Sequence, residues 1–277
     1  MKANPSMMEG LNSLPSISLD DLQRDAAFLT RADRKYVMPA SEIGRLLDTL
    51  DPETSVLEID GSREFRYFTP YFDTDHLDAY RNAAKRRPNR FKVRTRLYVD
   101  SGLRQLEVKV RDARGLTVKH RIEHAASPLE LLTEDERDWL REFPQVQSSA
   151  DRLGHCLTTL YRRRTLVLPD GLGRVTIDSD LEFALPDGTG LILPHHAVVE
   201  TKGAGRPTPV DRRLWRLGYR PVSCSKYAMG IALLFPNLPG NRWHRLRMHL
   251  HRAAEVRRPP ITEGFIAGGH AVLNPAP

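Results

Sequence analysis

The chain of 277 residues is poor in cysteine and has no long apolar run. Its two cysteines, Cys156 and Cys224, lie far apart and lack the spacing of a zinc site or a disulfide framework. No apolar segment approaches the roughly 20 residues that a membrane-spanning helix needs. The first residues also lack the apolar core of a secretory signal. We therefore expect a cytoplasmic protein, and any membrane partner would be a separate chain.

The sequence also lacks a glycine-rich phosphate loop of the Walker type, although its formal net charge is +7. Excess positive charge favours anionic partners such as phosphates, nucleic acid or an acidic membrane, and a general solubility bias gives the same balance. Aromatic residues do not alternate with basic residues as they do in a stacking platform for single strands, so we do not expect nucleic acid. A phosphate-binding protein without that loop must bind phosphate through side chains.

The order of predicted elements favours one domain. We expect a mobile lead over residues 1–18, a single domain over residues 19–250, and a tail over residues 251–277 that is basic and then rich in Pro and Gly. Alternation predicts strands over residues 31–39, 55–61, 64–74, 89–98, 103–111, 117–124, 164–169, 173–185, 190–194, 196–203 and 219–227. Caps and helical spacing predict helices over residues 18–30, 40–50, 77–85, 127–143, 148–163, 208–218 and 226–236. This succession predicts an α+β fold with a mostly antiparallel sheet.

Several predicted strands have one apolar face and one ionic face, because successive side chains point to opposite sides of a sheet. Between residues 91 and 97, the apolar face is Phe91, Val93, Thr95 and Leu97, and the ionic face is Lys92, Arg94 and Arg96. The segments 106–111, 118–123 and 174–183 repeat this plan. An open sheet with one solvated face also has such a pattern. However, stacked like charges destabilise a sheet unless an anion neutralises them. We therefore favour a β-barrel with cations lining its lumen and helices packed outside.

Seven motifs occur in order between residues 25 and 240: "TRADRKYVMP", "YFDTDHLDAYR", "RFKVRTRLYVDSGLRQLEVKV", "VKHR", "RVTIDSDLEF", "VVETKG" and "SCSKYAMGIALLFP". In this order they resemble the VTC domain, the polyphosphate polymerase domain of the vacuolar transporter chaperone family and its bacterial relatives. The resemblance implies a triphosphate tunnel metalloenzyme, whose antiparallel strands form a tunnel lined by Arg, Lys and Glu. It also implies transfer of the γ-phosphoryl group of ATP to inorganic polyphosphate, with Mn²⁺ or Mg²⁺ as the cofactor.

The resemblance further implies a set of site residues. The catalytic cations would be Lys35, Arg94, Arg96, Lys109, Arg163 and Lys226. The substrate contacts would be Arg31, Arg81, Lys119, Arg121, Tyr161, Arg174, Lys202 and Ser225. Glu200 of "VETK" matches the metal-binding glutamate, Glu107 is a less favoured second ligand, and Asp178, Asp180 and Glu182 would be counter-charges in the lumen. Two positions depart from the family: Ser223 stands where a lysine is expected, and Arg111 where a histidine is expected.

These residue types suit phosphoryl transfer, which needs positioning and positive charge more than covalent chemistry. The planar guanidinium of arginine binds phosphate oxygens in pairs. A magnesium or manganese ion takes most of its ligands from water and phosphate, so one or two carboxylates are enough. The same residues also fit a triphosphatase with water as the acceptor. A non-catalytic sensor that binds polyphosphate or another polyanion is a third hypothesis, which the two departures keep open.

Overall fold

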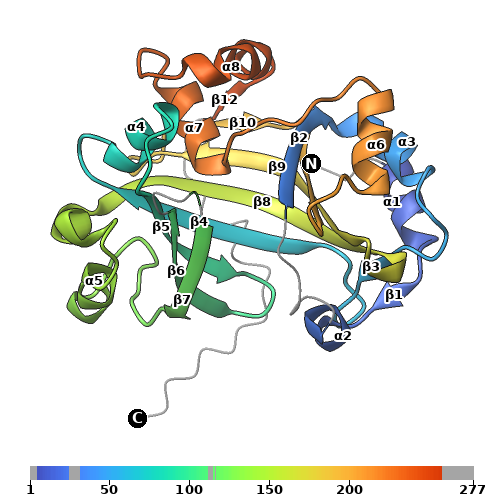
Figure 1. The fold of residues 1–277 in the computed structure, drawn as a ribbon, viewed down its shortest axis with the longest axis horizontal. Helices are drawn as coiled ribbons and strands as arrows, with labels where there is room; N and C mark the ends of the chain where they lie inside the picture. The colour runs from blue at the N-terminus through green and yellow to red at the C-terminus, as the bar shows by residue number, and fades with distance from the viewer. Residues whose placement is uncertain (1–4, 25–31, 112–114, 116, 258–277) are drawn as a thin grey trace.

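The structure is a computed structural model, and it describes residues 5–24, 32–111, 115 and 117–257. Its centre is a twelve-stranded sheet, shown in Figure 1, in which every strand pair is antiparallel except one. Two long strands, β8 (Gly154–Leu168) and β9 (Gly173–Ala184), form the central hairpin. The α+β fold and the mostly antiparallel sheet predicted from the sequence are confirmed.

The other strands extend this hairpin on both sides. Beyond β8 follow β4 (Phe65–Asp73), β5 (Arg90–Tyr98), β6 (Leu103–Arg111) and β7 (Thr117–Glu123). Beyond β9 follow β11 (His196–Gly203) and then β2 (Ala32–Pro39). β10 (Gly190–Leu193) and β12 (Glu255–Arg257) continue the other end of β9. β3 (Ser55–Leu57) pairs with β8, and β1 (Ser16–Ile17) runs parallel to β3.

The sheet curls but does not close by strand pairing. In Figure 1, β2 and β5–β7 all lie in front of β8 and β9. The charge of Lys35 on β2 lowers the pKa of Lys109 on β6, so the two ends of the sheet face each other across its concave side. Within the described ranges β2 and β7 do not pair, and the closed barrel expected from the sequence is therefore wrong. The structure instead has a tunnel-like, curled sheet.

A connector, residues 219–225, bridges the gap between the two ends of the sheet. The backbone N–H of Val222 donates to the carbonyl of Lys35 on the free edge of β2, at 2.7 Å. Farther along, the thiol of Cys224 lies close enough to Lys92 of β5 to affect the pKa of that amine. The strand predicted over residues 219–227 is therefore wrong: this segment is irregular, and α7 (Lys226–Leu234) begins at its end.

Helices cover the convex side of the sheet. α1 (Pro5–Asn12), α3 (Ile43–Leu47) and α6 (Pro209–Arg216) lie at one end in Figure 1. Tyr36, Ile177 and Val199 of the sheet share a core there with Leu11 and Leu214 of these helices. At the other end lies α5 (Glu134–Arg141), which begins at a capping box formed by Thr133. The lead expected over residues 1–18 thus contains α1 and β1, because its leucines have an apolar partner to pack against.

Two of the remaining helices, α4 (Asp78–Ala84) and α8 (His244–His251), contact α7. The third, α2 (Leu19–Arg24), lies near β1 and β3 in Figure 1. No helix in the described part of the chain is long and apolar enough to span a membrane. The tail expected over residues 251–277 contains β12, and residues 258–277 lie outside the described part.

α7 packs into one half of the concave face. A Cβ on Gly230 would lie 2.5 Å from Phe183 and 2.7 Å from Leu157, so this helix approaches β8 and β9 closely only because residue 230 is glycine. Leu157 belongs to a segment, residues 148–163, that the sequence pattern predicts as a helix. That prediction is wrong, since a short 3₁₀ turn over Gln147–Arg152 is followed by β8. The β-branched residues of β8 and its long pairing with β9 outweigh the helical spacing.

A β-bulge divides the concave face into two halves. The register of β8 and β9 shifts between Leu160 and Arg162, and Asp180 has a left-handed φ of 51°. Before the bulge, Ile177 belongs to the convex core, whereas Phe183 after it contacts α7 on the concave side. Asp180 therefore lies on the convex side, 3.5 Å from Arg162. The expectation that Asp180 is a counter-charge in the lumen is wrong, because the extra residue of the bulge turns the side chains that follow it to the opposite face of the sheet.

Candidate functional site

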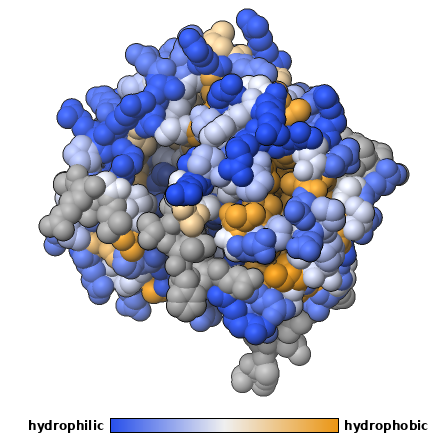
Figure 2. Space-filling model, turned by 45° about the vertical axis from the view of Figure 1, so that its right-hand side comes forward, coloured by the Kyte–Doolittle hydropathy of each residue, from blue (hydrophilic) through white to orange (hydrophobic). Residues whose placement is uncertain are grey.

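The other half of the concave face is ionic, and buried carboxylates organise it. The face of the molecule in Figure 2 is mostly hydrophilic and is hollowed on its left-hand side. On β6, Glu107 is 2% exposed and lies directly opposite Arg94 of β5. Arg94 donates to Glu107 at 2.6 Å, Lys119 donates to it at 2.5 Å, and Arg96 lies 3.7 Å away. Burial alone would raise the pKa of Glu107, but Arg94, Arg96 and Lys119 hold it well below its usual range.

Asp178 holds a second pair of cations. It is fully buried on β9, directly opposite Arg163 of β8. Arg163 donates two hydrogen bonds to it, at 2.6 and 2.8 Å. Lys226, the first residue of α7, donates to the same carboxylate. Burial favours the protonated acid, but the two cations keep the pKa of Asp178 well below its usual range. Asp178 thus links the hairpin of β8 and β9 to α7, the helix that packs into the other half of the concave face.

Glu200 of β11 is held less tightly. Its carboxylate lies 3.4 Å from Lys35, the residue opposite it on β2, and 3.8 Å from Lys202. Burial would raise its pKa, but the charges of Lys35, Lys202, Arg163 and Lys226 lower it to about 2. Glu200 is therefore ionised at neutral pH, and its contacts are long enough to leave its oxygens available to a further cation.

Four tyrosines separate these cations. The rings of Tyr67 and Tyr161 stack with centroids 5.1 Å apart. Arg96 lies 5.2 Å above Tyr67, and Lys226 lies 4.3 Å above Tyr161. The hydroxyl of Tyr161 accepts a hydrogen bond from Arg96 at 3.1 Å, and a nitrogen of Arg94 donates to the hydroxyl of Tyr71 at 3.2 Å. Tyr98 lies against Tyr67 and Arg96 in the same stack.

The mixing of aromatic and basic residues was not visible along the sequence, because it arises between strands. Alternation in β4 places Tyr67 and Tyr71 on one face, a signal that could have identified them. Tyr161 is 1% exposed and Tyr71 is 3% exposed. Since cations cover these buried rings, they do not offer free faces for stacking bases.

Two lysines form the part of the face that has no carboxylate of its own. Lys92 of β5 lies directly opposite Lys109 of β6. Within the described ranges neither lysine forms an ion pair. Burial, followed by the charges of Lys109, Lys35 and Arg94, lowers the pKa of Lys92 to about 7. Burial also lowers the pKa of Lys109, as do Lys35 and Arg94, while Asp33 and Glu200 offset part of this effect. An anion placed here would relieve the repulsion.

The remaining sequence-predicted residues lie in different places. Arg31 is outside the described residues. Arg81 lies on α4, where it donates to the carbonyl of His76 at 2.7 Å. Arg174 donates to the carbonyl of Leu22 at 2.8 Å, and Ser225 caps α7 by accepting from the N–H of Ala228. Arg121 is exposed on β7, opposite Glu107. The structure thus gathers the six cations that the sequence predicts as catalytic, together with Lys119, Tyr161 and Lys202, around the three carboxylates.

A divalent ion fits one of these carboxylates. Among the described residues there is no group of three or more His, Cys, Asp or Glu side chains that could hold a metal. Glu107 and Asp178 each accept short hydrogen bonds from two cations, whereas Glu200 has only the longer contacts. Mg²⁺ is commonly held by one or two carboxylates plus substrate phosphates and water. Glu200 suits that mode of binding, and Asp33, which sequence reasoning missed, lies near enough to affect Lys109 and Lys202.

The family model described as the VTC domain matches residues 30–235. Comparison with curated proteins gave no match. Among solved structures, the chain is similar to an adenylyl cyclase of Hippeastrum that is described with a dominant triphosphatase activity. The two share 16% sequence identity with a TM-score of 0.43, and the match covers 72% of this chain and 94% of the Hippeastrum protein. A protein of Pyrococcus horikoshii OT3 matches at 12% identity and a TM-score of 0.42, covering 70% of this chain and 91% of that one.

Proposed function

The chain belongs to the VTC domain family, and on this premise we propose that it is a metal-dependent polyphosphate polymerase that transfers the γ-phosphoryl group of ATP to a growing phosphate chain. One observation carries the proposal. Lys92 and Lys109 face each other on β5 and β6, neither forms an ion pair with a described residue, and the charges of Arg94 and Lys35 act on both of them. A linear phosphate chain would supply the negative charge that this pair of lysines lacks.

The clamp, defined as Arg94, Arg96, Arg163 and Lys226, is positioned before substrate binds. Each of these cations contacts a buried carboxylate, Glu107 or Asp178. Donors fixed in this way stabilise charge that develops on the equatorial oxygens of the transferred group without reorganising during the reaction. A divalent ion bound at Glu200 would add positive charge on the phosphate oxygens.

The acid–base properties of the site favour a phosphate acceptor over water. In phosphoryl transfer to a chain, a terminal phosphate oxygen forms the new P–O bond, and the bond to the ADP leaving oxygen breaks. That acceptor oxygen is already ionised, so no general base is needed. Hydrolysis is accelerated by a group that takes a proton from water. Glu107, Asp178 and Glu200 are weak bases because nearby cations lower their pKa values. A bound triphosphate would keep Lys92 protonated, because an adjacent anion raises the pKa of an amine.

The test is incubation of the purified protein with ATP and Mn²⁺, followed by gel detection of acid-labile chains and a parallel assay of free phosphate. We expect long chains from the wild-type protein and none from Arg94→Ala. Arg45→Ala is the matched control, since Arg45 is an exposed arginine on α3 whose one ion pair among the described residues is with its neighbour Glu42. Free phosphate without chains would overturn the proposal in favour of a triphosphatase. Binding of polyphosphate without ATP turnover would identify a sensor.

A further inference from the structure

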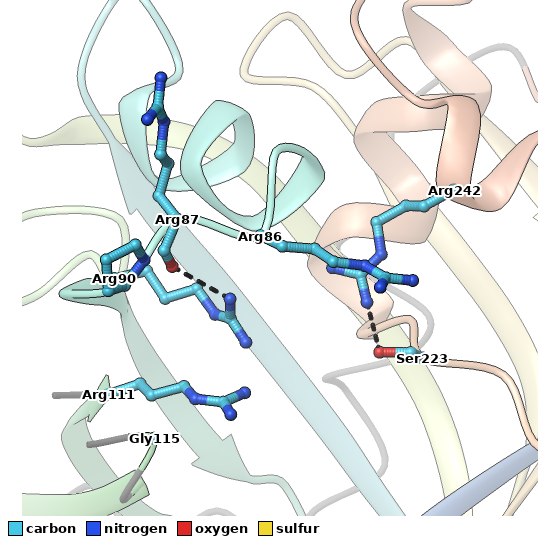
Figure 3. Close-up of a pocket in the computed structure, with 8 residues that line it drawn as sticks. Arg86, Arg87, Arg90, Arg111, Gly115, Ser223 and Arg242 are labelled. Carbon is cyan, nitrogen blue, oxygen red and sulfur yellow. Dashed lines mark hydrogen bonds between the residues drawn. The ribbon is translucent and has the colours of Figure 1, made fainter. Parts of the chain in front are cut away.

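A cavity of about 540 Å³ opens where the concave face meets the end of α4 (Figure 3). Arginines from four different segments line it. The side chains of Arg90 and Arg111 point into it from β5 and β6, and those of Arg86 and Arg242 approach from the opposite side. We call these four residues the arginine mouth. A fifth arginine, Arg87, turns its side chain away, and its carbonyl accepts a hydrogen bond from Arg90 at 3.1 Å.

Among the residues that the structure describes, the arginine mouth has positive charge without a counter-charge. No Asp or Glu of the described chain lines the cavity, and none of its four arginines forms an ion pair with a described residue. Burial and the charges of Arg111, Arg242 and Arg86 lower the pKa of Arg90. Arg242 is nevertheless fixed in place, because it donates to the carbonyl of Ala83 at 2.7 Å and to the hydroxyl of Ser223 at 2.5 Å. Four guanidinium groups held together in this way form a site for an anion.

The arginine mouth continues directly into the clamp. Arg90 lies opposite Arg111, the next pair on the same face is Lys92 and Lys109, and the pair after that is Arg94 and Glu107. At about 3.4 Å per residue, the four steps along the strand from Arg90 to Arg94 span roughly 14 Å. A triphosphate has only three phosphorus atoms and is too short to reach both. A longer linear phosphate chain can contact both the clamp and the arginine mouth.

We propose that the arginine mouth binds the part of a linear polyphosphate chain that extends beyond the clamp, so that the protein binds long chains more tightly than a triphosphate. The proposal rests on the proposed function for the clamp but adds a second site. Arg86, Arg90 and Arg111 lie within residues 30–235, which the family model matches, and Arg242 lies beyond them. Arg242 reaches the cavity from this later segment and donates to the hydroxyl of Ser223.

The experiment compares the affinities of the full chain for tripolyphosphate and for size-fractionated long-chain polyphosphate by isothermal titration calorimetry. In the double variant Arg90→Ala, Arg111→Ala we expect the advantage of the long chain to fall roughly tenfold or more, because each charge-assisted hydrogen bond contributes about 1.5–3 kcal/mol. Affinity for tripolyphosphate should stay within about twofold, since the clamp is intact. Arg87→Ala is the matched control, because it removes one positive charge from the same cavity wall without removing a guanidinium from the mouth.

Each result decides between the proposals. Equal affinities of the wild-type protein for the two phosphates, or a double variant that keeps the long-chain advantage, would overturn the arginine mouth. So would an equal loss in Arg87→Ala, or an equal advantage for poly-glutamate or single-stranded DNA of matched charge. A protein that binds the long chain through the mouth but does not bind tripolyphosphate would overturn the proposed function alone. Thermal unfolding of each variant shows that it is folded, and Arg111→Lys, which keeps the charge, should restore part of the advantage.

Discussion

Replacement of Asp178 by Asn should destabilise the protein strongly in phosphate-free buffer. Asp178 is fully buried and accepts three hydrogen bonds from Arg163 and Lys226. The substitution leaves both cations without the carboxylate to which they are hydrogen-bonded, in a buried part of the site. Removal of one partner from a buried ion pair costs about 3–5 kcal/mol, which is a large part of the roughly 5–15 kcal/mol that stabilises a typical protein. For a domain of this size the melting temperature should fall by roughly 6–20 °C.

The same variant should be rescued by phosphate. A ligand present at about a hundred times its Kd stabilises a protein by about 2.7 kcal/mol. Asp178→Asn frees two cations of the clamp, so tripolyphosphate should bind the variant more tightly than it binds the wild-type protein and should stabilise it more. The difference in melting temperature between the two proteins should therefore shrink as tripolyphosphate is added.

The assay is thermal and urea unfolding, with and without tripolyphosphate. Asp187→Asn is the control, because Asp187 lies in an exposed turn and, of the residues the structure describes, its side chain hydrogen-bonds with Thr189 alone. A second variant, Asp178→Asn with Lys226→Met, should be less destabilised than the sum of its single changes, since one unpaired charge is removed. The reasoning is refuted if Asp178→Asn costs less than about 1 kcal/mol, or if tripolyphosphate stabilises both proteins equally.

Four further predictions follow from other parts of the site. Arg94→Ala and Arg96→Ala should each lower ATP turnover roughly a hundredfold or more, while the fold persists because Glu107 keeps Lys119 as a partner. Glu200→Gln should abolish the response of activity to Mn²⁺ but keep polyphosphate binding. Above pH 7 the protein should take up protons when it binds phosphate, because the pKa of Lys92, about 7 in the free protein, rises beside an anion. Calorimetry in two buffers of different ionisation enthalpy measures this proton uptake, and Lys92→Met should abolish the uptake. Gly230→Ala should cost about 1–3 kcal/mol in urea unfolding, because its Cβ would overlap Phe183.

Contrary results would each remove one part of the reasoning. Wild-type turnover in both arginine variants would exclude the clamp. An unchanged Mn²⁺ response in Glu200→Gln would exclude that residue as the metal ligand. Proton uptake that persists in Lys92→Met would place the titrating group elsewhere. A Gly230→Ala protein as stable as the wild type would show that α7 does not approach the sheet as closely as the structure indicates.

Alternation along single strands was enough to predict which side chains of β5 and β6 face the core. Phe91, Val93 and Leu106 are buried on the convex side, whereas Lys92 and Arg94 lie on the other face, as the period of two requires. The ionic face could be predicted in this way because each strand carries its own pattern. The closure of the sheet could not, since it depends on how strands at opposite ends of the sheet meet, which no local pattern encodes.

Features that depend on contacts between strands were missed. One extra residue near Asp180 exchanges the two faces of β9, and nothing in the local sequence marks it as a bulge. Helical spacing in residues 148–163 also fits a strand, and the pairing of β8 with β4 and β9 decides between them. Arg242 enters the cavity from a segment after the family motifs, so only the folded chain brings it beside Arg111.

The connector over residues 219–225 has a consequence for how long anions reach the clamp. Among the described residues, a single backbone hydrogen bond, from Val222 to Lys35, fastens it to β2. Residues 219–222 can move away from β2 by breaking that one bond, which leaves every strand ladder intact, while Ser223 stays hydrogen-bonded to Arg242 and Trp243. Under the proposed function, a long anion would then be laid in from the side instead of being threaded from one end, and a finished product would leave by the same route without the sheet coming apart.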